Sequence, residues 1–138
     1  MIPSYSGVVA HPHMFDDDDP LLARVRAAAA TFPGTSEKVS HGRPAFFTKK
    51  VFAYYGGSIR VGEEWVQHPH AIVVRPDEDD RLALQEDPRV FIPAYLGPSG
   101  WIGFDLHEGG DWDEVVELLD SSFRLTAPRR LIDELDAK

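Results

Sequence analysis

Residues 45–55 read AFFTKKVFAYY, and two short runs of aromatic and β-branched side chains lie on either side of Lys49-Lys50. Such runs are typical of strands, and their two-residue separation predicts a tight β-hairpin, although lysine is not a favoured turn residue. The apolar run 71–75 and the alternating run 101–106 predict two more strands, and 59–61 is a weaker candidate. Strands joined by short turns favour an antiparallel sheet.

Helices are predicted before and after these strands. The run 16–20, DDDDP, supplies a capping aspartate and a proline for the first helical turn, and an apolar stripe follows as far as Phe32. A second helix is predicted from Asp111 through Phe123, where apolar residues recur at helical spacing. We also expect a short helix over 77–84, an irregular stretch over 90–98 and a last short helix after Pro128. The predicted fold class is α+β, with one antiparallel sheet and helices packed on one face.

Length and composition predict one domain. The chain has 138 residues, 43% of them hydrophobic, which is enough for one core without a metal or a disulfide. We expect residues 1–15 to form a loosely ordered N-terminal arm and residues 16–138 to form the domain. No apolar run is long enough to cross a membrane, and the first residues do not resemble a secretion signal, so we expect a cytoplasmic protein without a membrane partner. Whether it is a monomer or a homodimer stays open.

Several chemistries are excluded or disfavoured by the sequence. The absence of cysteine excludes a disulfide scaffold, a thiolate zinc site and a cysteine nucleophile. The glycine-rich nucleotide loops and the GxSxG and HExxH motifs are also missing. The triplets His11-Pro12-His13 and His68-Pro69-His70 could each offer two imidazoles, but a stable metal site needs three or four ligands. We therefore predict no metal, no cofactor and no catalytic residue.

Charge is unevenly distributed along the chain. The net charge is −9, yet residues 38–75 carry six basic side chains and only two acidic ones. An acidic protein is not a typical nucleic-acid binder, but a local basic segment can attract an anion. Within this segment, His41 could shift a proton near neutral pH, Arg43 could bind a carboxylate or phosphate, and Gly42 would let a ligand approach the backbone.

The order and spacing of several short motifs resemble the MmcQ/YjbR-like family. They are TFPGTSE at 31–37, GRPAF at 42–46, KVFA at 50–53, IPAY at 92–95, Trp101 and LLDSSF at 118–123. The resemblance extends over about residues 18 to 136, and it implies a compact α+β domain similar to the frataxin-like, "double wing" arrangement. It carries no catalytic residues over to this chain. Proteins of this family are often described as DNA-binding, and where they commonly have Ser-Tyr this chain has Ser122-Phe123.

Three functions therefore stay open. The leading hypothesis is a non-catalytic binding domain, for DNA, in which basic side chains of the segment 38–75 contact phosphates; Arg129-Arg130 would join them if the fold brings them near. The candidate contacts are Lys38, His41, Arg43, Lys49 and Lys50. The second is a small-molecule binding protein or enzyme that holds an anionic ligand with His41 and Arg43. Its pocket would include Tyr54, His70 and Tyr95. The third is a protein-interaction module.

Overall fold

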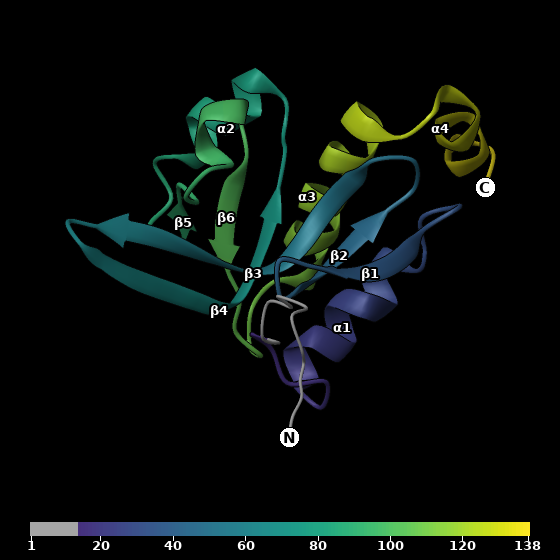
Figure 1. The fold of residues 1–138 in the computed structure, drawn as a ribbon. Helices are drawn as coiled ribbons and strands as arrows, with labels where there is room; N and C mark the ends of the chain where they lie inside the picture. The colour runs from purple at the N-terminus through teal and green to yellow at the C-terminus, as the bar shows by residue number, and fades with distance from the viewer. Residues whose placement is uncertain (1–13) are drawn as a thin grey trace, which may run out of the picture.

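The computed structural model describes residues 14–138 and confirms the α+β class (Figure 1). The helices are α1 (Pro20–Ala29), α2 (Glu78–Leu84), α3 (Trp112–Thr126) and α4 (Arg129–Asp136), with a short 3-10 helix η1 (Gly97–Ser99). The strands are β1 (Ser36–Ser40), β2 (Arg43–Phe47), β3 (Val51–Val61), β4 (Glu64–Val74), β5 (Val90–Phe91) and β6 (Ile102–Asp105). Within residues 14–138, none of the helices has the length and apolar character that a membrane span requires.

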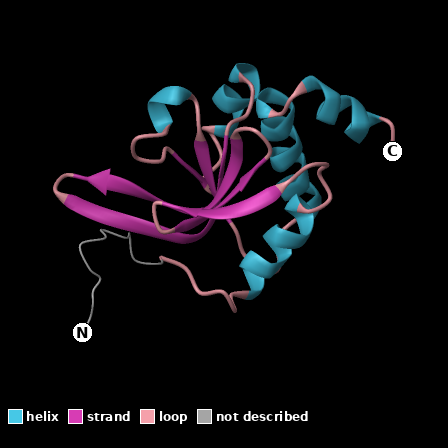
Figure 2. Cartoon of the chain, turned by 45° about the vertical axis from the view of Figure 1, so that its right-hand side comes forward, coloured by secondary structure: helices cyan, strands magenta, loops and turns pink. Residues whose placement is uncertain are grey.

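The six strands form one antiparallel sheet in the order β1-β2-β3-β4-β6-β5. The predicted hairpin of β2 and β3 is confirmed. The pairing of β3 with β4 continues to Val61 and Glu64, so these strands form a long hairpin that projects from the sheet (Figure 2). β1 was not predicted, because its sequence SEKVS is polar and four of its five residues are exposed at the edge of the sheet. The stretch predicted to be irregular contains the two-residue strand β5.

Helix boundaries follow the capping signals. The Asp19 side chain accepts a hydrogen bond from the backbone N–H of Leu21, and Pro20 occupies the first turn, as the sequence predicts. α1 ends at Ala29, three residues earlier than predicted. The reason is that Thr31 and Phe32 bond to the carbonyl three residues before them, which closes a tighter last turn.

The core lies between the sheet and helices α1 and α3, which pack on the same face (Figure 2). A β-bulge supplies its centre. Phe46 pairs with Ala53 and Phe47 pairs with Val51, so Phe52 is an extra residue, and both Phe52 and Ala53 are completely buried. The Phe52 ring lies 5.3 Å from that of Phe123 on α3, in an edge-to-face contact.

Ser122 of α3 fixes this helix to the sheet. Its completely buried hydroxyl donates to the carbonyl of Phe52 and accepts from the backbone N–H of Arg75 at 2.9 Å. Ser122→Ala would leave both backbone groups without this partner, so we expect the free energy of unfolding to fall by about 1–2 kcal/mol. Urea denaturation measures it, with Ser121→Ala on the same helix as the control. Equal losses in the two variants would contradict the assigned role.

Candidate functional site

Basic side chains from three separate segments lie at one end of the sheet. Leu131 of α4 packs against Gly34, where an added Cβ would lie 2.9 Å from the leucine side chain. Ser36, just after Gly34, pairs with Phe47, so the start of α4 lies near the turn between β2 and β3. The pairing of Ala53 with Val74 places the end of β4 beside the start of β3. We call the resulting cluster the basic end; its members are Lys49, Lys50, Arg75, Arg129 and Arg130.

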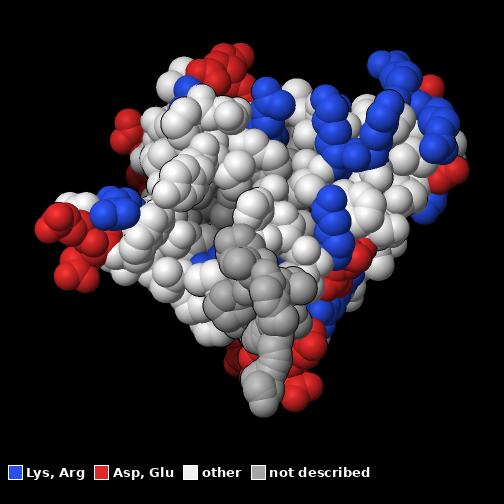
Figure 3. Space-filling view, viewed as in Figure 1, with Lys and Arg blue, Asp and Glu red and all other residues white. Residues whose placement is uncertain are grey.

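The basic end is exposed and largely without acidic partners. All five side chains are exposed. Arg129 forms an ion pair with Asp133 at 3.1 Å, whereas within residues 14–138 the other four have no ion-pair partner. Figure 3 shows basic side chains in a row toward α4. This arrangement is suited to several phosphates at once.

The predicted anion-binding residues do not all join this cluster. Lys49 and Lys50 belong to it. Lys38 of β1 lies opposite Ala45, with its ammonium 4.7 Å from the centre of the Phe47 ring. His41 adopts a φ of 53° in the turn that joins β1 to β2, at the opposite end of β2 from the two lysines. Arg43 is only 9% exposed.

Arg43 lies on the face of the sheet opposite α1 and α3. Its guanidinium Nη2 donates to the Gly57 carbonyl at 3.4 Å and to the side-chain oxygen of Gln67. Burial lowers the pKa of Arg43 because the charged form loses hydration. Tyr54 lies on the same face, where its pairing with Val73 places it, and burial raises the pKa of its phenol. Its ring lies 5.6 Å from that of Trp101.

His70 belongs to a different site. The buried carboxylate of Asp19 accepts hydrogen bonds from the Tyr55 hydroxyl and from Nδ1 of His70, the latter at 2.9 Å. Burial alone raises the pKa of Asp19, but the hydrogen bonds from Tyr55, Leu21 and His70 outweigh it and hold the pKa below its usual value. Burial, together with the bond to Asp19, raises the pKa of Tyr55.

A cavity of about 430 Å³ opens beside this network, lined by Met14, Phe15, Asp16, Asp19, Pro20, Pro69 and His70. The Asp19 contact at Nδ1 orients the imidazole of His70, whose side chain is 55% exposed. The ionisable side chains among the described residues that line the cavity are Asp16, Asp19 and His70. The network connects the start of α1 to the sheet.

The two histidines of the second His-Pro-His triplet do not share a site. His68 stacks on Phe91 with ring centres 3.8 Å apart and bonds to Asp105 at 2.9 Å, whereas His70 bonds to Asp19. The first triplet lies outside the described residues. Among residues 14–138, no three His, Cys, Asp or Glu side chains are grouped so that they could hold a metal ion.

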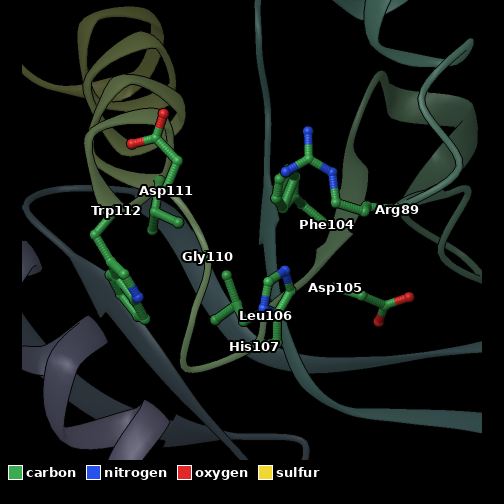
Figure 4. Close-up of a pocket in the computed structure, with 9 residues that line it drawn as sticks. Arg89, Phe104, Asp105, Leu106, His107, Gly110, Asp111 and Trp112 are labelled. Atoms are coloured by element: carbon green, nitrogen blue, oxygen red, sulfur yellow. The ribbon is translucent and has the colours of Figure 1, made fainter.

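Tyr95 and the pocket beside Arg89 do not belong to the sites described above. Tyr95 is 83% exposed, and its ring lies 5.9 Å from that of Trp65, beside the long hairpin. The pocket in Figure 4, which includes Arg89 and Trp112, has a volume of about 10 Å³. That volume suits one water molecule. Arg89 is moreover occupied, since it forms ion pairs with Asp87 and Glu114.

Comparison with known proteins agrees with this architecture. The family model described as YjbR matches residues 30–125. No curated protein matches the chain. Among solved structures, the crystal structure of a protein from Pseudomonas syringae is similar, with a TM-score of 0.58 and 17% sequence identity. The similarity covers 75% of this chain and 97% of that one, and at this identity it shows the fold alone.

Proposed function

This chain belongs to the YjbR family, and we propose that it is a non-catalytic DNA-binding domain whose contact surface is the basic end. One observation carries the proposal. Basic side chains from the β2–β3 turn, the end of β4 and the start of α4 converge, and among residues 14–138 four of the five have no acidic partner. Exposed, unpaired cations that follow one end of a domain are suited to a row of phosphates.

The net charge of −9 does not prevent such contacts. Charges separated by more than about 8 Å are largely screened at physiological ionic strength, so acidic groups elsewhere on the surface act weakly at the basic end. Part of the acidic surface is also compensated by ion pairs, since Arg26, Arg89 and Arg124 each pair with two carboxylates.

We propose that the basic end contacts the phosphate backbone of duplex DNA and does not stack on exposed bases. Among residues 14–138, the exposed aromatic side chains are Trp65 and Tyr95, which contact each other beside the β3–β4 hairpin, away from the basic end. Stacking of single-stranded bases requires aromatic platforms along the binding groove. We therefore propose phosphate contacts that depend weakly on sequence.

The proposal is tested with Lys49→Ala combined with Lys50→Ala and a short fluorescent duplex in an anisotropy titration. Loss of two phosphate contacts is expected to weaken binding about tenfold and to reduce the slope of log affinity against log salt by about 2. Arg60→Ala is the control, since it removes a basic side chain from the far end of β3, where Arg60 packs over Trp65. An equal effect of the control, or an unchanged affinity in the double variant, would count against the basic end.

A further inference from the structure

Arg43 carries a buried positive charge whose protein partners are neutral. The side chain is 9% exposed, and its contacts are the Gly57 carbonyl and the Gln67 amide oxygen. Within residues 14–138, no carboxylate lies at ion-pair distance, and neither Nε nor Nη1 has a hydrogen-bond partner. Burial of a charge is unfavourable unless an opposite charge accompanies it. Among residues 14–138, the hydrogen-bond partners of the Arg43 guanidinium are thus both neutral.

The backbone is shaped to admit this guanidinium. Gly56 has a φ of +89°, a conformation that favours glycine, and an added Cβ would lie 2.2 Å from Nη1 of Arg43. The pairing of β3 with β4 shifts between Tyr55 and Gly57, and the bulge lies on β4, where the three residues 69–71 face the single residue Gly56. The bulge and the glycine together open the space that Arg43 occupies.

The surroundings of Arg43 on this face are apolar and aromatic. Ala45, two residues along β2, pairs with Tyr54, whose ring contacts Trp101. On the other side, the space above Gly57 is bounded by Val73 and the ring of Phe91. Figure 3 shows this face of the sheet, opposite α1 and α3, hollowed near its centre. A concave apolar surface with one buried charge is the usual form of a small-ligand site.

We propose that this hollow binds a small organic carboxylate with a planar apolar body. Nη2 of Arg43 is already engaged by Gly57 and Gln67, so Nε would donate one charge-assisted hydrogen bond to a carboxylate oxygen. The apolar body would pack against Tyr54 and Trp101. One negative charge compensates the one buried guanidinium, whereas a doubly charged phosphate ester would bring one charge that this pocket does not balance.

The test follows the side-chain Nε–H signal of Arg43 by NMR in the wild-type protein. The probes are benzoate, neutral benzamide of nearly the same shape, and phenyl phosphate. We expect a saturable shift of the Arg43 signal with benzoate and none with benzamide. In Arg43→Met, we expect benzoate affinity to fall at least about tenfold, because the charge-assisted hydrogen bond is lost. Arg60→Met, the same substitution at an exposed site of β3, is expected to keep wild-type affinity.

Three results would contradict the proposal. Tighter binding of phenyl phosphate than of benzoate at Arg43 would contradict the carboxylate assignment. Equal shifts with benzoate and benzamide would show that the guanidinium does not recognise charge. If the Arg43 signal shifts with none of the three probes, the hollow does not bind them and the proposal is wrong. This measurement uses only the wild-type protein, so it does not depend on whether a variant folds.

Discussion

Asp19→Ala is expected to lower the free energy of unfolding by about 2–4 kcal/mol near neutral pH. The variant loses the cap of α1 and leaves the buried hydroxyl of Tyr55 without its carboxylate partner. It also frees His70 from the contact that connects β4 to the start of α1. Urea denaturation measures the loss. Asp16→Ala, which removes an exposed neighbouring carboxylate, is the control and is expected to change little. A small effect of Asp19→Ala would show that this network does not hold α1 to the sheet.

The contribution of Asp19 is also expected to depend on pH. The hydrogen bonds of the folded state hold the pKa of Asp19 below its unfolded value of about 3.9. The stabilisation is therefore complete above the unfolded pKa, and it is lost as the pH falls through the folded pKa. Relative to Asp19→Asn, which keeps a capping oxygen, the wild-type advantage at about pH 5 should shrink below about pH 4. A difference that stays constant down to about pH 2 would contradict this account.

Arg43→Met is expected to act in the opposite direction and raise the free energy of unfolding by about 1–3 kcal/mol. Methionine matches the aliphatic stem of arginine, packs in an apolar site and removes a charge that burial disfavours. The loss of the Gln67 contact offsets part of this gain. A wild-type arginine that lowers the stability of the protein is expected if this residue is needed for ligand binding.

The measurement compares urea denaturation of Arg43→Met and Arg60→Met with the wild type. Arg60 is exposed and bonds to the Gly62 carbonyl, so its replacement should have an effect within about 0.5 kcal/mol. If Arg43→Met instead destabilises the protein by more than about 1 kcal/mol, the guanidinium is a structural element of the sheet, and its burial no longer argues for a ligand.

The sequence predicts those parts of the fold that have local signals. The caps at Asp19 and Asp111, the stripe of α3 and the hairpin of β2 and β3 depend on neighbouring residues, and each is present. β1 was missed because a polar edge strand has no alternating pattern. The length of the β3–β4 hairpin was also underestimated, because glycines and acidic residues interrupt its strand pattern.

The candidate sites were predicted less completely, because they depend on contacts between distant residues. Asp19 meets Tyr55 and His70 across 36 and 51 positions, and Arg43 meets Gln67 across 24. No spacing rule connects such residues before the topology is known. Arg129-Arg130 joins the lysines only because Leu131 packs on Gly34. The sequence thus indicates which side chains could bind an anion, but only the folded structure shows which of them lie on the same surface.

The salt dependence of duplex DNA affinity, measured with the wild-type protein from about 50 to 200 mM salt, tests the central claim most directly. If the four unpaired cations of the basic end contact phosphates, log affinity should decrease linearly with log salt concentration. These cations are Lys49, Lys50, Arg75 and Arg130. The expected slope is about −3 to −4, at roughly 0.9 per phosphate neutralised. An affinity that does not change over this range, or no binding even at the lowest salt, would contradict DNA binding through the basic end.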